Sequence, residues 1–170
     1  MTSMPRARLS VAAVQVNTPV DDKWDGTSEA ILESYVSATR PLTDSAVELV
    51  VWPETATPVP LRFRDWARRR LQHLSDSTGL AIVTGATDYA GEAQRGLTPY
   101  NAAFYIRPHE AELLSSAKVH LVPFGERIPG QGLFPFLGKL RLGQAEFRPG
   151  SAVKVFSRHG AIAPFACLIC

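Results

Sequence analysis

Apolar residues in the first half of the chain form short valine-rich runs separated by stripes with helical spacing. The runs 9–16, 47–52 and 80–86 are nearly continuous in apolar residues, as is typical of strands covered on both faces. The stripes between them have three- and four-residue spacing and consist of Ile31, Leu32, Tyr35 and Val36, then Phe63, Trp66, Ala67, Leu71 and Leu74. The pattern predicts strand, helix, strand, helix, strand, with 9–16 as a central strand.

Residues at the ends of the two stripes predict where the helices begin and end. Thr27 precedes the first stripe and is a good N-cap, and this helix must end before Pro41. The second helical pattern starts from Pro60, and Gly79 is well placed to cap its C-terminus. We therefore expect two helices that cover a mostly parallel sheet.

The second half of the chain predicts two strand pairs separated by a long irregular segment. Segments 101–106 and 110–117 read as a hairpin that follows a surface loop over 91–99. From Leu121 to Gly150 there are four prolines and six glycines without sustained periodicity, and such long loops are usually functional. Segments 152–156 and 161–169 are expected to form the last strand pair.

Composition is that of one soluble globular domain over residues 1–170. Hydrophobic residues make up 45% of the chain and charged residues 20%. The net charge of +2 is too small to indicate a nucleic-acid-binding surface, so we expect no nucleic-acid partner. The one basic cluster, Arg68-Arg69-Arg70, is interpreted as a solvated helix face.

Membrane, metal and redox signals are weak in this chain. Its apolar runs are far shorter than the roughly 20 residues that cross a bilayer, and the N-terminus lacks the features of a signal peptide. Cys167 and Cys170 form a C-x-x-C pair, but no second pair accompanies it. We therefore expect neither a metal site nor a redox centre.

Three side chains with reactive groups each lie at the end of a strand-like run. Glu54 follows 47–52, Lys118 follows 110–117, and Cys170 closes 161–169. A carboxylate, an ammonium and a thiol are the groups needed to form a thiolate and stabilise an oxyanion. Because active sites of open α/β sheets gather at strand ends, we expect Glu54, Lys118 and Cys170 to converge. The pattern predicts a cysteine acyl-transfer enzyme.

A series of motifs surrounds these residues along nearly the whole chain. In order they are Val14-Gln15-Val16-Asn17, Lys23-Trp24-Asp25, Trp52-Pro53-Glu54-Thr55-Ala56, Tyr100-Asn101-Ala102, Lys118-Val119-His120-Leu121-Val122-Pro123-Phe124-Gly125-Glu126, Phe147-Arg148-Pro149-Gly150 and Leu168-Ile169-Cys170. With these motifs the chain resembles the nitrilase (carbon–nitrogen hydrolase) superfamily and, within it, the catalytic domain of the apolipoprotein N-acyltransferase family. The resemblance implies an α-β-β-α sandwich, here incomplete at the C-terminus.

The resemblance also implies roles for individual residues. Glu54 becomes the general base, Lys118 the stabiliser of the oxyanion and Cys170 the nucleophile. Glu126 becomes a second essential carboxylate that supports the lysine or the proton of the thiol. The implied reaction needs no cofactor and no metal. His120 lies in the same motif, but no partner requires it, and we interpret it as a packed structural histidine.

The reaction implied by the resemblance is acyl transfer in two steps. A fatty acyl group passes from a phospholipid to Cys170 and then to the N-terminal amine of a diacylglyceryl-modified lipoprotein. The expected location is the inner membrane with the catalytic domain on the periplasmic side, anchored by a membrane domain that this chain lacks. Trp24 and the apolar cluster 133–140 either fill the core or line the acyl-chain entrance.

The chain departs from the family pattern in ways that keep two alternatives open. Ser116-Ala117 replace the usual tyrosine before the lysine, no membrane-spanning bundle precedes the domain, and the family continues beyond the position of Cys170. We therefore expect an N-terminal part of the domain that is inactive alone. The alternatives are a soluble amidase with the same three residues, and an inactive fragment.

Overall fold

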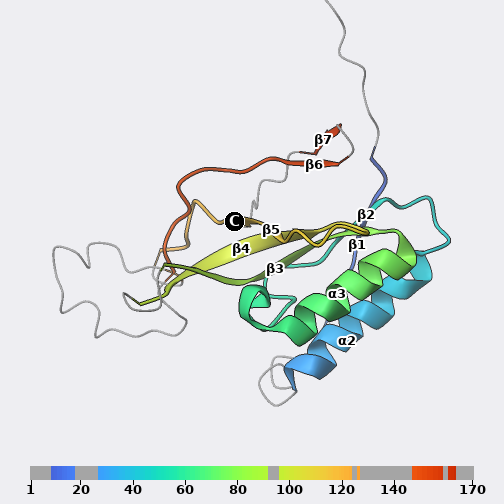
Figure 1. Ribbon diagram of the computed structural model, residues 1–170, viewed down its shortest axis with the longest axis horizontal. Coiled ribbons are helices and arrows are strands. Elements are labelled where there is room, and N and C mark those ends of the chain that lie inside the picture. The colour runs from blue at the N-terminus through green and yellow to red at the C-terminus, as the bar shows by residue number, and fades with distance from the viewer. Residues whose placement is uncertain are drawn as a thin grey trace, which may run out of the picture.

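The computed structural model describes residues 9–17, 27–91, 96–123, 126, 147–158 and 161–163. Figure 1 shows a central twisted sheet with two helices packed on one of its faces. The elements in order are β1 (Val11–Ala13), α2 (Ser28–Thr39), the 3₁₀ helix η1 (Arg40–Leu42), β2 (Leu49–Val51), the 3₁₀ helix η2 (Leu61–Phe63), α3 (Asp65–Thr78), β3 (Ala81–Ala90), β4 (Thr98–Ile106), β5 (Leu114–Ala117), β6 (Phe156–Arg158) and β7 (Ala161–Ala163).

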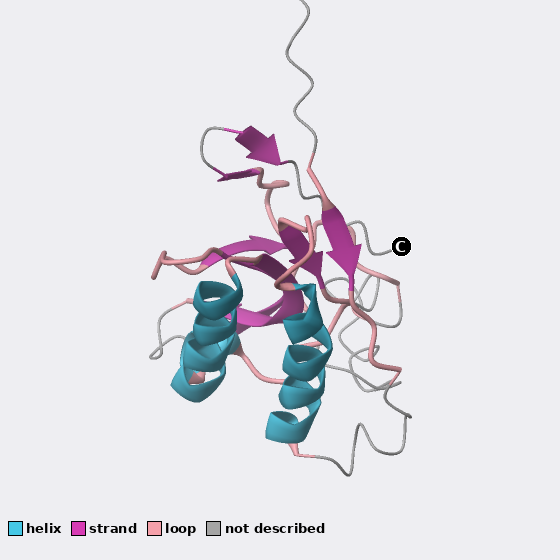
Figure 2. Cartoon of the chain, turned by 90° about the vertical axis from the view of Figure 1, so that its right-hand side faces the viewer, coloured by secondary structure: helices cyan, strands magenta, loops and turns pink. Residues whose placement is uncertain are grey.

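The five-stranded sheet has the order β1-β2-β3-β4-β5. Its first three strands are parallel, whereas β4 runs antiparallel to both β3 and β5. Helices α2 and α3 connect the parallel strands and lie side by side on the same face of the sheet (Figure 2). The predicted unit of strand, helix, strand, helix, strand is confirmed, and so is the β4–β5 hairpin.

Local interactions explain the helix bounds. The Thr27 hydroxyl accepts a hydrogen bond from the Ala30 N–H at 3.2 Å, which confirms the predicted N-cap. Gly79 ends α3 with a φ of 70°, a left-handed conformation that glycine adopts without strain. The start of α3 was predicted too early: non-helical backbone at Arg64, with φ −121° and ψ 85°, separates η2 from α3. Phe63 consequently lies outside the helix and is exposed.

Strand bounds differ from the apolar runs because backbone pairing extends beyond them. Strands β3 and β4 pair from Ile82 with Ile106 to Ala90 with Thr98, so Thr98 and Pro99 belong to β4 and not to the predicted surface loop. Strand β5 starts only at Leu114. Strand β1 is an edge strand in the described sheet, with Val11 exposed, so the prediction of a central strand for 9–16 is wrong there.

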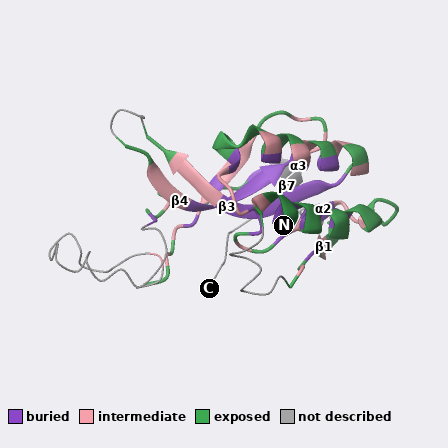
Figure 3. Ribbon diagram, turned by 90° about the horizontal axis from the view of Figure 1, so that it is seen from below, coloured by how far each residue is buried: buried purple, intermediate pink, exposed green. Residues whose placement is uncertain are grey.

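Both faces of the middle of the sheet are buried (Figure 3). Val50 and Ile82 pack beneath the helices, whereas their neighbours Leu49 and Val83 belong to a second apolar cluster on the other face. Phe156 joins that second cluster, with its ring centroid 5.4 Å from that of Tyr105. Because alternate residues of a strand face opposite sides, covering both sides explains the continuous apolar runs.

The last strand pair lies on the sheet face opposite the helices (Figure 1). Strands β6 and β7 are antiparallel, as predicted, but β6 begins only at Phe156, and Val153 and Val155 are exposed. The described residues therefore contain one helical layer, the main sheet and this two-stranded element. None of the helices in the described ranges is long and apolar enough to cross a membrane.

Candidate active site

Four polar side chains converge at the end of the sheet where β4 begins. Glu54 comes from the turn after β2, Asn101 from β4, and Lys118 directly follows β5. Glu126, eight residues further on, reaches the same place. The Nζ atom of Lys118 lies 3.4 Å from Oε1 of Glu54, so the predicted convergence of these two residues is confirmed.

Backbone interactions continue the strands into the site. The Trp52 N–H donates to the Val83 carbonyl at 2.8 Å, which extends the β2–β3 pairing by one residue before Pro53. The Ala56 N–H then donates to the Pro53 carbonyl, closing a turn that carries Glu54. Thr55 in this turn has a φ of 57°, a conformation that non-glycine residues seldom adopt and that concentrates at functional sites.

A glycine in β3 allows this turn to approach the sheet. A Cβ atom on Gly85 would lie 2.8 Å from the Cα of Glu54 and 2.8 Å from the backbone nitrogen of Thr55. Real Cβ atoms essentially never come so close to backbone atoms. Because Gly85 has no side chain, the backbone of Glu54 and Thr55 can lie directly against β3.

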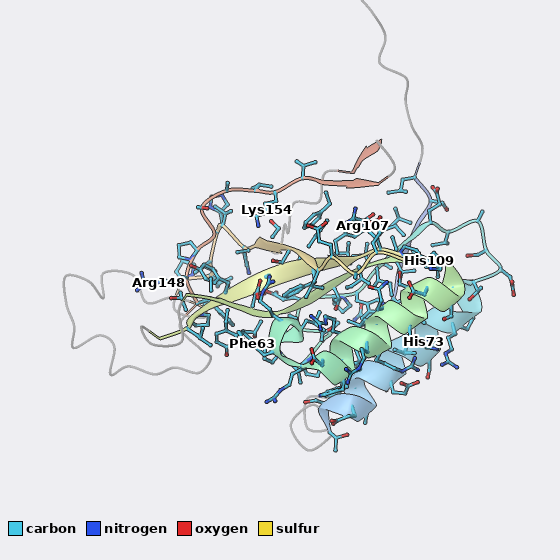
Figure 4. All side chains as sticks on the ribbon, viewed as in Figure 1. Phe63, His73, Arg107, His109, Arg148 and Lys154 are labelled. Carbon is cyan, nitrogen blue, oxygen red and sulfur yellow. The ribbon has the colours of Figure 1, made fainter. Side chains whose placement is uncertain are left out.

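Lys118 is held from both sides through its backbone. Its N–H donates to the Asn101 carbonyl at 2.7 Å, and its carbonyl accepts from the Gly150 N–H at 2.8 Å. Gly150 approaches so closely that a Cβ there would lie 2.6 Å from the Ala117 carbonyl oxygen. The neighbouring Arg148 is labelled in Figure 4, beside the end of the sheet where β4 begins and far from Arg107 and His109.

The four side chains form one network of charge-assisted hydrogen bonds. Lys118 Nζ lies 3.1 Å from Oε1 and 3.0 Å from Oε2 of Glu126, in addition to its contact with Glu54. The amide of Asn101 donates to Oε1 of Glu54 and, at 2.7 Å, to Oε1 of Glu126. The Val122 N–H donates to Oε2 of Glu126 at 2.8 Å. Two carboxylates thus share one ammonium and one amide.

Burial differs sharply among the charged groups. The Lys118 side chain is 2% exposed and that of Glu126 11%, whereas Glu54 is 29% exposed. Burial favours the neutral amine of Lys118, but the hydrogen bond to Glu126 and the charges of both carboxylates outweigh it and raise the lysine pKa. Burial likewise opposes ionisation of Glu126, but bonds from Val122, Lys118 and Asn101 hold its pKa below the usual range.

Glu54 is the member of the network that borders open space. It lines a hollow of about 190 Å³ together with Gln15, Asn17, Ile31, Tyr35, Pro53 and Thr55. A carboxylate here can exchange a proton with a group in the hollow while Lys118 stays buried behind it. The arrangement combines a reachable base with a fixed cation, as needed for attack on a carbonyl carbon.

The structure corrects one residue assignment and adds another. His120 is exposed, so its interpretation as a packed histidine is wrong; it lies in the bend that follows buried Lys118. Asn101 is a member of the network that the sequence reasoning did not assign to the site, although it lies in the Tyr100-Asn101-Ala102 motif. Asn101 is uncharged and lies inside an apolar strand, so the sequence pattern does not distinguish it as a site residue.

The remaining candidate residues lie outside the four-residue network or outside the described ranges. Cys167, Cys170, Trp24 and the cluster 133–140 lie outside the described residues. Arg68 and Arg69 are exposed on α3, as predicted for a solvated face, and Arg70 pairs with Glu33 at 2.6 Å. Across the described ranges, no group of three or more His, Cys, Asp or Glu residues is arranged to hold a metal ion.

Sequence comparison finds one family model along almost the entire chain. The model described as carbon-nitrogen hydrolase matches residues 10–170. Among curated proteins, the apolipoprotein N-acyltransferase of Geobacter metallireducens is 32% identical over 149 residues, which is 86% of this chain and 28% of that protein. The proteins of the same name from Chlorobaculum tepidum and Azotobacter vinelandii are 26% and 32% identical, over 96% and 98% of this chain. The chain spans about a third of the length of these relatives.

Solved structures show the same architecture. A mutant amidase of the nitrilase superfamily from Nesterenkonia superposes with a TM-score of 0.58 at 21% identity, covering 91% of this chain and 53% of the amidase. The same amidase in complex with acrylamide gives a TM-score of 0.57 at 20% identity, covering 95% of this chain and 56% of the amidase. These similarities establish that the fold is a nitrilase-like α/β fold.

Proposed function

The chain belongs to the carbon–nitrogen hydrolase family, and from that premise we propose that it carries the catalytic site of a lipoprotein N-acyltransferase. The proposed reaction moves a fatty acyl group from a phospholipid, through a cysteine thioester, to the N-terminal amine of a diacylglyceryl-cysteine lipoprotein. The observation that carries the proposal is the buried Lys118 ammonium fixed between Glu54 and Glu126. The names of the curated relatives from Geobacter metallireducens and Chlorobaculum tepidum support the choice of substrates.

The first half of the proposed reaction forms the thioester. The Sγ atom of Cys170 attacks the ester carbonyl of the phospholipid, and Glu54 takes the proton of the thiol. Lys118 stabilises the oxyanion that develops on the carbonyl oxygen. The C–O bond then breaks, the lysophospholipid oxygen takes the proton from Glu54, and the acyl group remains on sulfur.

The second half transfers the acyl group to nitrogen. The α-amine of the lipoprotein attacks the thioester carbonyl, a C–N bond forms and the C–S bond breaks. Glu54 accepts the proton lost by the amine and returns it to the Cys170 sulfur. The cycle balances without oxidant, reductant or cofactor, and Lys118 faces the same oxyanion position in both halves.

The lipid substrates favour a site at a membrane surface. Both the phospholipid and the diacylglyceryl group are anchored in a bilayer, so the acyl ester must be reached where lipid meets water. We place the site on the periplasmic side of the inner membrane. Glu126 serves this site by holding Lys118 in its charged form through contacts at 3.1 and 3.0 Å.

Transfer of a labelled acyl chain tests the proposal. A version of the protein that extends past Cys170 is incubated with phosphatidylethanolamine vesicles that carry deuterated acyl chains and with a synthetic diacylglyceryl-cysteine peptide. Mass spectrometry is expected to find the deuterated acyl group on the peptide amine with wild type, and none with Cys170→Ser. Ammonia release from small amides without peptide acylation would instead identify an amidase, and no turnover of either kind would indicate an inactive protein.

A further inference from the structure

The amide of Asn101 is the neutral centre of the charged network. The residue is only 4% exposed and lies in β4, between β3 and β5. Its side-chain nitrogen carries two protons, and these reach Glu54 Oε1 and Glu126 Oε1. Both facing atoms are carboxylate oxygens, which accept hydrogen bonds, so the amide must present its nitrogen and not its oxygen.

The donors that reach Glu54 are distributed unevenly between its two oxygens. Within the described part of the chain these donors are the Asn101 amide and the Lys118 ammonium, and both reach Oε1. Glu126 differs, because Lys118 contacts both of its oxygens and the Val122 N–H binds Oε2. Counting only the described residues, Glu126 is therefore held at both oxygens and Glu54 at one.

The neutrality of Asn101 also determines the charge of the network. Two ionised carboxylates and one ammonium give a formal charge of −1. A lysine or arginine at position 101 would neutralise that charge and make both carboxylates weaker bases. An amide fixes the two carboxylates in place and leaves one of them able to accept a proton.

We propose that Asn101 is a positioning residue that binds Oε1 of Glu54 and so presents Oε2 as the oxygen that exchanges protons with Cys170. This inference rests on the proposed function, because the proton in question is that of the proposed nucleophile. Asn101 itself touches neither the substrate nor the sulfur in this account. The titratable and charged groups that face its amide from the described elements are Glu54, Glu126 and Lys118.

The test uses a version of the protein that extends past Cys170 and measures the initial rate of acyl-thioester formation on Cys170 from mildly acidic to mildly alkaline pH. Phosphatidylethanolamine vesicles are the acyl donor and intact-protein mass spectrometry is the readout. Asn101→Ala is expected to lower the rate about 10- to 100-fold, as for the loss of a hydrogen bond to a charged group. The acid limb of its rate profile, where the rate falls as pH decreases, moves to higher pH, because the variant lacks the hydrogen-bond donor that favours the ionised carboxylate.

Asn101→Asp provides a second variant of nearly identical shape. It removes the donor and adds a third negative charge, so the acid limb moves further up than in Asn101→Ala. If Asn101→Ala does not fold, the aspartate variant alone decides the question. The predicted order of the acid limbs is wild type lowest, Asn101→Ala next and Asn101→Asp highest.

Gln72→Ala is the matched control. The Gln72 amide also donates two hydrogen bonds, to Asp76 at 2.8 Å and to the Arg107 carbonyl at 2.9 Å, but it lies on α3 outside the network. Its loss is expected to lower the melting temperature and to leave the acid limb in place. A merely structural role for Asn101 would give this same pattern and would overturn the proposal.

Failure of the proposed function gives a different result. If wild type forms no thioester, the proposed reaction is contradicted. The ionisation of the carboxylates is then followed by measuring the free energy of unfolding at several pH values. Asn101→Ala must then lose stability at a higher pH than wild type while Gln72→Ala does not. Identical acid limbs in Asn101→Ala and wild type would overturn the positioning role in either assay.

Discussion

Lys118 and Glu126 form the buried ion pair on which the charge state of the site depends. Their closest atoms are 3.0 Å apart, and their side chains are 2% and 11% exposed. Breaking a buried pair by removing one partner is costly, because it leaves the other charge without compensation. The surface pair Arg70–Glu33 has an even shorter contact of 2.6 Å, but half of the Glu33 side chain is exposed to water and salt.

The lowered pKa of Glu126 predicts a pH-dependent contribution to stability. A carboxylate whose folded pKa lies below its unfolded value of 4.5 stabilises the protein above that value and loses this contribution as pH falls through the folded pKa. Glu126→Gln should therefore flatten the loss of unfolding free energy below about pH 4.5, as measured by urea titration at several pH values.

Glu33→Gln controls for an exposed pair, because the Glu33 pKa is also lowered, chiefly by its hydrogen bond from Arg70. Its effect should be smaller and should vanish at high salt, whereas that of Glu126→Gln persists. Equal effects that are equally sensitive to salt would contradict a buried pair at Lys118.

At the scale of elements, the turn after β2 depends on the strand beneath it. Glu54 is held over β3 by the Thr57 N–H, which donates to the Gly85 carbonyl at 3.1 Å, and by the hydroxyls of Thr57 and Thr84, 2.9 Å apart. On the helical side, the Trp52 indole donates to the Thr39 hydroxyl at 3.0 Å. The turn is thus fixed from both the sheet and α2.

Gly85→Ala should displace this turn. The new Cβ would meet backbone atoms of Glu54 and Thr55 at 2.8 Å, so the turn must move, at a cost of about 1–3 kcal/mol. Thioester formation should fall together with stability. Gly79→Ala is the control: it has a left-handed φ of 70° but open space around it, and should cost about 1–2 kcal/mol without changing the acyl-transfer rate per folded molecule. Full activity in Gly85→Ala would contradict the role of this contact.

Element types could be predicted from the sequence, but several element bounds could not. Continuous apolar runs identify β2 and β3 because both faces of these strands are buried. The pairing of Asp88 and Tyr89 with Tyr100 and Pro99 involves half-buried residues, and no apolar pattern marks it. Val11 looks like a core residue but is exposed on β1, an edge strand of the sheet that the described residues form.

The charged residues of the site could be predicted from the sequence, but the neutral residue Asn101 could not. Glu54 and Lys118 end strands, and strand ends converge in this type of sheet. Asn101 sits among apolar residues of β4, and its part in the network follows only from the β4–β5 register, which places its carbonyl against the Lys118 N–H. The side-chain bonds of a neutral residue depend on this three-dimensional placement, which sequence spacing does not give.

On the scale of the whole molecule, the segment after Gly150 covers the sheet face opposite the helices. Phe156 is buried there against Tyr105, whereas Val153 and Val155 on the same segment are exposed. In Figure 4, Lys154 also lies on this side of the sheet. Phe156 thus packs the end of this segment on the sheet. The start of the segment contacts the site, because the Gly150 N–H donates to the Lys118 carbonyl.

Phe156→Ala should remove that anchor. Truncation of a buried phenylalanine costs about 3–5 kcal/mol, and the segment should then detach from Tyr105. Val155→Ala, one position away and exposed, is expected to change stability by less than about 0.5 kcal/mol. Urea denaturation measures both variants, and a small cost for Phe156→Ala would contradict the packing of this segment on the sheet.

The central claim, that the Glu54–Lys118 pair serves a cysteine nucleophile at position 170, is tested most directly by locating the acyl group. A version of the protein that extends past Cys170 is incubated with phosphatidylethanolamine vesicles as sole acyl donor. It is then digested and analysed by mass spectrometry for a thioester on the peptide that contains Cys167 and Cys170. Wild type and Cys167→Ser are expected to carry the acyl group on Cys170, and Lys118→Met to carry about 100-fold less, as for the loss of an oxyanion donor. An acyl group on Cys167, or undiminished acylation in Lys118→Met, would contradict the account.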